Sequence, residues 1–185
     1  MSVQRVSCRW CGALVPDVSG PVHKYVPSAP GCWQTFEQLQ ADESLRFGYP
    51  PVHRLVVDAY MAQHPGDGSD RRDRQSVFVH LAGLCAVLEL KLEPNHATDV
   101  LRRVLEAHDD FPVLARENGP GELTVLHLVG AGDLGDYQHR AQATRFHHAT
   151  SSLQTAARHL LCAARQVASG YRIWRRVASI SDVRR

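Results

Sequence analysis

The sequence predicts a mainly α-helical protein, a helical bundle with a small irregular zinc-knuckle lobe at its N-terminal end. Apolar residues recur at helical spacing through most of residues 33–135. Residues 1–32 lack this periodicity and are rich in proline, glycine, serine and cysteine. Hydrophobic residues make up 44% of the 185-residue chain, enough for an ordinary globular core. We therefore expect one compact domain.

The predicted lobe covers residues 1–32 and packs on a helical core of residues 33–135. The first helix of that core is expected over residues 33–44, because Trp33, Phe36 and Leu39 are spaced to share one face. The sequence Tyr49-Pro50-Pro51 ends it, since proline cannot continue a helix.

Three further helices are expected after this break. Residues 52–63 form the second, ended by His64-Pro65-Gly66, and a polar loop of residues 66–74 follows. Residues 75–92 form a helix that is apolar nearly all round and is therefore central in the bundle. Residues 96–108 form the fourth.

The remaining segments are harder to assign. The segment 123–129 fits either a short strand or the start of a helix. Residues 136–185 are predicted to form an arginine-rich helical tail in two pieces, broken near Gly170. Both assignments rest on weaker apolar patterns than those of the four helices.

Composition excludes several classes of function. The net charge of +2 is too small to argue for a nucleic-acid partner. The chain has no run of about 18 apolar residues, so we expect no membrane span. The N-terminal residues show no apolar signal-peptide region, and a cytoplasmic protein is expected. The open partner classes are another protein and a second copy of the chain.

The strongest chemical motif is a cysteine cluster in the lobe. Cys8 and Cys11 form a Cys-x-x-Cys turn followed by Gly12, and this spacing lets two sulfurs face one metal ion. Cys32 stands at the start of the first predicted helix, where the helix dipole favours its thiolate form. His23 is the nearest candidate for a fourth ligand. The four residues predict a Cys₃His site for Zn²⁺, although iron also binds sulfur ligands.

A second group contains histidines and a carboxylate: His53, Asp58, His64 and His80. His80 lies within the apolar third helix, where a histidine needs a polar partner. Asp58 is flanked by apolar residues, so Asp58, His64 and His80 are candidates for an acid–base or metal site. A hydrogen-bonded structural network, such as Asp58 with His80, explains the same pattern. His53 and His64 are about 16 Å apart along a regular helix and cannot share one ion.

Several ordered blocks also resemble an uncharacterised bacterial family, a domain of unknown function. Residues 8–33 carry Cys-x-x-Cys-Gly-Ala, Gly-Pro-x-His-x-Tyr and Ser-x-Pro-Gly-Cys-Trp. Residues 53–66 read His-Arg-Leu-x-Val-Asp-Ala-Tyr-x-x-Gln-His-Pro-Gly, and residues 75–85 read Gln-Ser-Val-x-Val-His-Leu-x-Gly-Leu-Cys. The resemblance spans roughly residues 8–130 and implies no known activity. It implies that these blocks belong to one domain.

Three hypotheses of function follow. The first is a zinc-binding helical protein with a binding or regulatory role, and it requires only the cysteine cluster. The second is a metal-dependent enzyme in which the histidines and Asp58 frame a metal-activated water. The third is a thiol redox protein that uses Cys8 and Cys11. The first is favoured, because no residue pair shows a nucleophile–base spacing.

Overall fold

The computed structural model describes residues 4–88, 91–106, 110–111, 113 and 123–144. This part of the chain is mainly helical, as predicted, with one small sheet. Its elements are β1 (Arg5–Ser7), β2 (Leu14–Pro16), α1 (Pro30–Phe47), α2 (His53–Ala62), α3 (Arg71–Leu88), α4 (Pro94–Glu106), the 3₁₀ turn η1 (Val125–His127) and α5 (Leu134–Thr144). The greater part of the predicted arginine-rich tail, residues 145–185, lies outside the described residues.

Local sequence explains most helix ends. α1 begins at Pro30, whose fixed φ suits the first turn of a helix. It ends at Phe47 and is capped by Gly48, which has φ 62°. α3 begins at Arg71, inside the predicted loop of residues 66–74. The reason is Asp70, whose carboxylate accepts a hydrogen bond from the Arg72 amide at 2.6 Å and so caps the helix.

The N-terminal lobe has more regular structure than its composition predicts. β1 and β2 pair in antiparallel fashion, with Val6 opposite Val15. The segment 123–129 proves to be the 3₁₀ turn η1, and the Thr124 hydroxyl caps it by accepting from the Leu126 amide at 3.3 Å.

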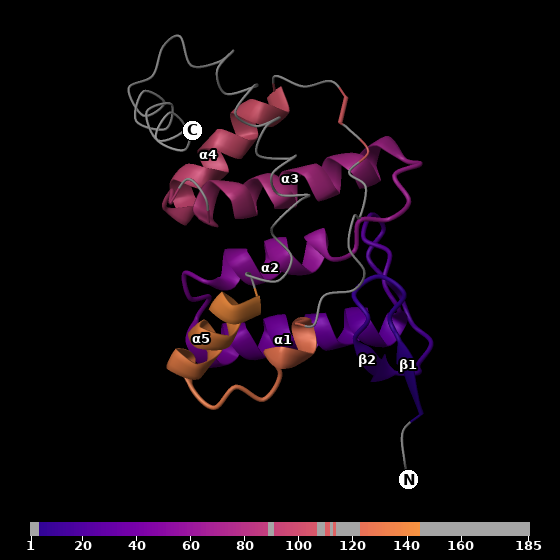
Figure 1. The fold of residues 1–185 in the computed structure, drawn as a ribbon. Helices are drawn as coiled ribbons and strands as arrows, with labels where there is room; N and C mark the ends of the chain where they lie inside the picture. Colours follow the sequence, from indigo (N-terminus) through magenta and orange to yellow (C-terminus); the bar gives the residue numbers. More distant parts are fainter. Residues whose placement is uncertain (1–3, 89–90, 107–109, 112, 114–122, 145–185) are drawn as a thin grey trace, which may run out of the picture.

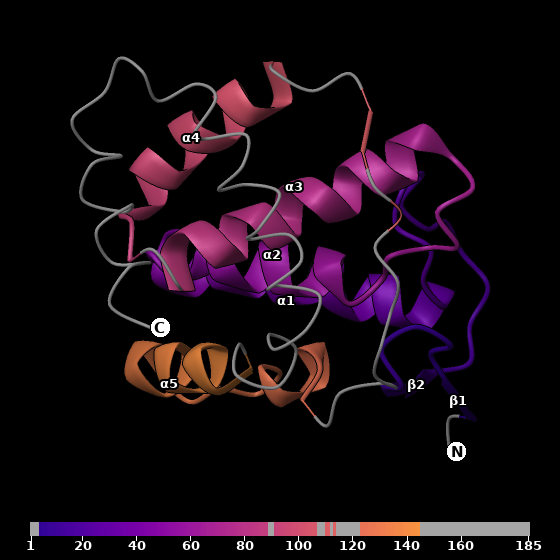
Figure 2. The same cartoon turned by 45° about the horizontal axis from the view of Figure 1, so that its top comes forward.

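The helices α4, α3 and α2 follow one another across the molecule, and α1 and α5 lie on the opposite side of α2 from α3 (Figure 1 and Figure 2). The hairpin lies beside α1. α2 therefore contributes to two clusters of buried residues. Val56 and Tyr60 face the hairpin, α1 and α5, whereas Leu55 and Ala59 face α3 and α4.

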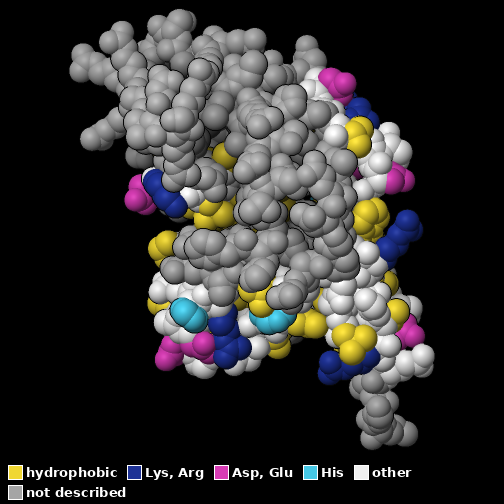
Figure 3. All heavy atoms as spheres, in the orientation of Figure 1, with side chains coloured by type: hydrophobic (Ala, Val, Ile, Leu, Met, Phe, Trp, Pro, Cys, Tyr) yellow, Lys and Arg dark blue, Asp and Glu magenta, His cyan; other side chains and the backbone are white. Residues whose placement is uncertain are grey.

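The visible described residues on one face of the molecule carry charges of both signs. On the face drawn in Figure 3, lysine and arginine side chains lie beside acidic ones and do not gather into one basic patch. Within the described part of the chain, no helix is both long and apolar enough to cross a membrane.

Candidate metal centre

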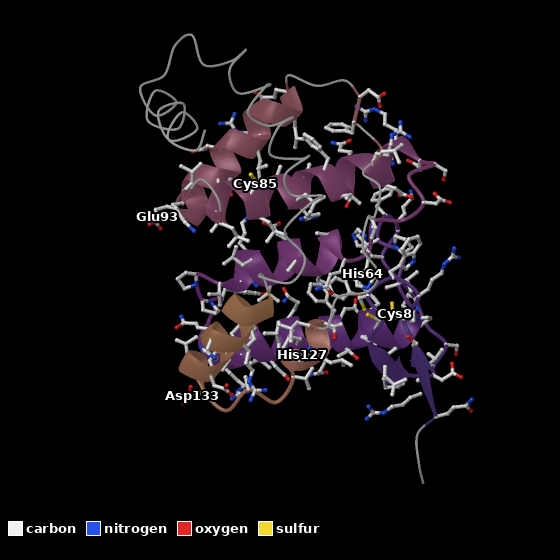
Figure 4. The ribbon with its side chains drawn as sticks, viewed as in Figure 1. Cys8, His64, Cys85, Glu93, His127 and Asp133 are labelled. Atoms are coloured by element: carbon white, nitrogen blue, oxygen red, sulfur yellow. The ribbon has the colours of Figure 1, made fainter. Side chains whose placement is uncertain are left out.

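Four metal-ligating side chains converge where the hairpin meets α1 and α2. They are Cys8 and Cys11 from the turn between β1 and β2, Cys32 from the first turn of α1, and His64 just beyond α2. Their ligand atoms all lie within 4.8 Å of one another. All four residues are at most 1% exposed. Figure 4 shows Cys8 and His64 meeting at the edge of the hairpin.

The turn that carries Cys8 and Cys11 is closed by backbone hydrogen bonds. The Gly12 amide donates to the Cys8 carbonyl at 2.8 Å, and the Cys8 amide donates to the Ala13 carbonyl at 2.8 Å. Gly12 has φ 77°, a conformation that side-chain-bearing residues rarely adopt. The Cys-x-x-Cys-Gly motif thus forms the knuckle that its sequence predicts, with both sulfurs on the inner side.

Cys32 lies at the start of a helix, as predicted, and its neighbour Gly31 brings that helix against the hairpin. A Cβ atom at Gly31 would overlap the backbone carbonyl of Pro16. Only glycine therefore allows α1 to approach β2 this closely. The close approach places the Cys32 sulfur 3.7 Å from that of Cys11.

His64 presents one ring nitrogen to the sulfurs because the other is already engaged. Its Nδ1 donates to the Tyr60 carbonyl at 2.7 Å. A carbonyl only accepts, so the neutral ring carries its proton on Nδ1 and leaves the Nε2 lone pair free. Nε2 lies 3.6 Å from the Cys8 sulfur and 3.5 Å from the Cys32 sulfur. A second bond of this kind is typical of metal-ligating histidines.

These separations fit a tetrahedral metal site. With metal–sulfur bonds of about 2.3 Å and metal–nitrogen bonds of about 2.05 Å, tetrahedral angles place two sulfurs about 3.8 Å apart and a sulfur and a nitrogen about 3.6 Å apart. The observed distances of 3.7 Å for Cys11–Cys32 and 3.5–3.6 Å for the Cys8–His64 and Cys32–His64 pairs agree. The buried Cys₃His group can therefore hold a metal ion.

Aromatic side chains support the cluster from outside. The Tyr60 hydroxyl donates to the Cys32 sulfur at 3.6 Å, and its ring stacks on Phe36 with centroids 3.9 Å apart. Burial, and then the neighbouring Cys32 sulfur, raises the pKa of Tyr60 well above its usual value. Tyr60 therefore stays protonated and remains a hydrogen-bond donor to a ligating sulfur.

The sulfurs share their protons unequally. Hydrogen bonds from Cys11 and Cys32 hold the pKa of Cys8 far below the usual value, while contacts with Cys11 and Cys8 raise the pKa of Cys32. Burial lowers the pKa of His64, but its contacts with Cys11 and Cys8 outweigh burial and raise it to about 9. A lowered thiol pKa favours the thiolate form of Cys8, which is the form that binds a metal ion.

The structure places His64, not His23, with the three cysteines. The His23 ring lies against Trp33, with centroids 5.3 Å apart, and its Nδ1 accepts from the Tyr25 amide at 3.3 Å. His23 is close to Cys32 in sequence, but its loop directs the ring onto the partly buried rings of Tyr25 and Trp33. His64 is 32 residues from Cys32 in the chain and reaches the cluster because α2 runs back along α1.

The structure separates the four residues proposed for the enzyme site. His53 Nδ1 is 2.8 Å from Glu43 Oε2, and His64 belongs to the cysteine cluster. Asp58 binds His80 Nδ1 at 2.8 Å and Arg54 Nε at 3.0 Å. Among the described residues, the group of ligand atoms that could hold a metal ion thus includes His64 but not His53, Asp58 or His80. Asp58 and His80 form the hydrogen-bonded pair that the sequence left open as the alternative.

One signal in the sequence points to His64. It follows the last turn of α2 and precedes Pro65-Gly66, so the chain leaves the helix axis immediately beyond it. A histidine at such a turn can point its ring toward an element that lies beside the helix. A histidine before a Pro-Gly turn differs in this respect from His53, which begins α2, and from His80, which lies within α3. The pattern alone does not say which neighbouring element the ring will meet.

The fold and this cluster define the class of protein: a mainly helical chain with a buried Cys₃His group that can hold a metal ion. The chain belongs to the family of unknown function DUF5946, whose model matches residues 6–165. This match confirms the resemblance to a domain of unknown function. No curated protein and no solved structure matches the chain.

Proposed function

We propose that the chain is a zinc protein in which Cys8, Cys11, Cys32 and His64 form a closed structural site, and that its role is to bind or regulate a partner. The observation that carries this proposal is the mutual distance of the four ligand atoms, all within 4.8 Å, in side chains that are almost fully buried. In this proposal the fourth metal ligand is His64, whereas the sequence analysis predicts His23.

The donor set supports zinc. Three sulfurs and one imidazole nitrogen in a tetrahedral arrangement suit Zn²⁺, which has no redox chemistry and favours four ligands in structural sites. Iron also accepts sulfur ligands, so the metal must be identified by measurement.

A closed site supports a structural role. Catalytic zinc sites keep one position open for water, whereas here the protein supplies four ligands and solvent reaches none of them appreciably. The metal would join the hairpin, the start of α1 and the end of α2, which are far apart in the chain. The separation of His53 and the Asp58–His80 pair from this cluster further favours a binding role over catalysis.

The test is the metal content of the purified full chain by elemental analysis, for the wild type, His64→Ala and His80→Ala. His80 is a matched control, because its ring is also hydrogen-bonded through Nδ1 but to Asp58, away from the cysteines. We expect one zinc per chain in the wild type and in His80→Ala, and loss of that zinc in His64→Ala.

Each other outcome would contradict a specific part of the proposal. A second metal that His80→Ala removes would favour the metal-dependent enzyme. A metal-free wild type with a reversible disulfide among Cys8, Cys11 and Cys32 would favour the thiol redox protein. Iron in place of zinc would contradict the identity of the metal but not the four ligands of the site.

A further inference from the structure

The charges of the chain are divided unevenly along its length. Residues 145–185 contain eight arginines and one aspartate, a net charge of +7, whereas residues 1–144 contain 13 Lys and Arg against 18 Asp and Glu, a net charge of −5. The small net charge of the whole chain therefore hides a basic C-terminal segment (residues 145–185) joined to an acidic body (residues 1–144). Opposite charges attract each other, and the covalent connection keeps the two parts at a high local concentration.

The end of the C-terminal segment also has an apolar side. Its large apolar residues fall at helical spacing and share one face: Ile173, Trp174, Val177 and Ile180. The three arginines between Tyr171 and Val177 fall on the opposite face. Residues 166–185 lie beyond the match to the family model and outside the described residues. A basic amphipathic sequence of this kind fits an apolar groove with an acidic rim.

The body has such a groove along α1. A cavity of about 270 Å³ lies between α1, the end of β2 and the segment that joins η1 to α5 (Figure 1). Its walls include Leu39, Phe47, Leu128 and Ala131, and none of the four residues of the metal centre. Pockets for free small molecules usually enclose about 300–1,000 Å³, so this cavity is better suited to one or two protein side chains.

The floor of the cavity is closed and its rim is open. Glu43 and Tyr137 line it, but both side chains are buried and hydrogen-bond to each other, so they offer no free polar group to an occupant. At the rim, Val129 is 48% exposed and Asp42 is also exposed. An occupant therefore meets apolar walls first and a carboxylate at the edge.

The rim carboxylate is available to a cation. Among the described residues, the hydrogen-bond partner of Asp42 is the neutral amide of Gln38, at 2.8 Å. The arginine of the lining, Arg46, donates to the Gly132 carbonyl at 2.8 Å and lies over the Phe47 ring. An incoming guanidinium group can therefore pair with Asp42 without displacing an arginine.

The C-terminal segment is long enough to reach this groove. It begins where α5 ends, at Thr144, and Tyr137 of the same helix lines the cavity. Residues 145–170 precede the amphipathic part, and a flexible chain of that length spans about 28 Å on average. The length of α5 is only about 16 Å. The amphipathic part can therefore return to α1 of its own chain.

We propose that residues 171–183 bind in the groove along α1 of the same chain, with Trp174 in the cavity. The apolar face of this part covers Val129, and Arg176, at the edge of that face, pairs with Asp42. The inference does not depend on the metal centre. It gives the groove an internal occupant, which an outside partner would have to displace in order to bind there.

The test compares NMR spectra of the full, metal-loaded wild type with those of Trp174→Ala and Asp42→Lys. Tyr171→Ala is the matched control for the first variant, because Tyr171 is an aromatic residue of the same segment that lies off the apolar face. Glu37→Lys is the control for the second, because Glu37 is an exposed carboxylate of α1 that does not line the cavity.

We expect Trp174→Ala to shift the backbone amides of residues 34–47 and 128–131, although these lie far from position 174 in the sequence. The heteronuclear NOE of residues 171–183 should fall in the same variant, because the segment is released. Asp42→Lys should lower this NOE too, since it replaces attraction by repulsion. Both controls should leave the signals of these regions unchanged. Retention of the metal by each variant shows that the body is folded.

Three results would overturn the proposal. The first is a Trp174→Ala variant that keeps its metal and leaves the amides of α1 unchanged, which would mean that the arginines serve an outside anion. The second is a set of shifts that fades on dilution of the protein, which would make a second copy the occupant. The third is an equal response to Asp42→Lys and Glu37→Lys, which would mean that overall charge acts and not this groove.

Discussion

The two sides of α2 are stabilised in different ways. Toward the hairpin, the buried residues form a metal-side cluster that includes Cys8, Cys11, Cys32, Val15, Val26, Phe36, Leu39, Val56 and Tyr60. Toward α3 and α4, they form a helix-side cluster of Leu55, Ala59, Val77, Phe78, Leu81, Ala82, Leu84, Cys85, Leu101 and Phe111. The first cluster gathers its members from short strands and loops as well as helices, and the second draws almost entirely on helices.

This difference indicates where a bound metal ion would stabilise the fold. The helix-side cluster buries large aliphatic and aromatic side chains on helices that satisfy their own backbone hydrogen bonds. The hairpin has strands of only three residues each, and its turn and the start of α1 contribute three small thiols to the buried cluster. So short a sheet gains little stability alone, and a metal ion bound to three elements would supply what apolar contact does not.

Removing the metal should have the largest effect, confined to one side of α2. After chelation, we expect hydrogen exchange to lose protection at β1, β2 and the first turn of α1, while the amides of α3 stay protected. Apparent binding free energies of structural zinc sites are about 10–16 kcal/mol, enough to control the folding of the lobe. Equal loss of protection on both sides of α2 would contradict the division described here.

Leu81→Ala tests the other side. Leu81 is 5% exposed in the helix-side cluster, and its truncation should lower the free energy of unfolding by about 2–5 kcal/mol. Urea unfolding measures this change, and elemental analysis should still find the metal. The control is Leu45→Ala, because Leu45 is 84% exposed and should change stability by less than about 0.5 kcal/mol. Loss of the metal in Leu81→Ala would show that the two clusters depend on each other.

Two glycines offer a matched pair across α2. A Cβ atom at Gly31 would overlap the Pro16 carbonyl, and one at Gly83 would overlap the Asp58 carboxylate. Each Gly→Ala variant should lose about 1–3 kcal/mol of stability by overpacking. Only Gly31→Ala should also weaken metal binding, because it moves Cys32 away from the hairpin. Competition with a chromogenic chelator measures the affinity, and equal affinities in the two variants would contradict this account.

The helices were predictable because their signals are local. The apolar spacing of Trp33, Phe36 and Leu39, and the helix breaks at Pro50-Pro51 and Pro65-Gly66, depend on neighbouring residues. The start of α3 was placed too late because charged residues follow Asp70, which proves to be the capping residue. The hairpin was missed because strands of three residues are too short for an alternating pattern.

The candidate site was predictable in part for the same reason. Cys8, Cys11 and Cys32 could be grouped by spacing and by position at a turn and a helix start, and the structure places them together. The fourth member of the cluster is determined by how α2 packs on α1, which no local pattern records. The burial of Glu43 was predictable from the sequence, because it follows Phe36 and Leu39 at helical spacing and therefore shares the buried face of α1.

The smallest expected effect distinguishes the two histidines. His23→Ala removes a ring that contacts Trp33 and Tyr25 at the surface, and it should lower the free energy of unfolding by less than about 1 kcal/mol. Metal content should stay the same and metal affinity nearly so, in contrast to His64→Ala, because only the His64 Nε2 faces the sulfurs. Elemental analysis and chelator competition on the two variants make the comparison. If His23→Ala released the metal and His64→Ala kept it, the lobe would bind its metal through its own loop alone, and α2 would serve only as packing.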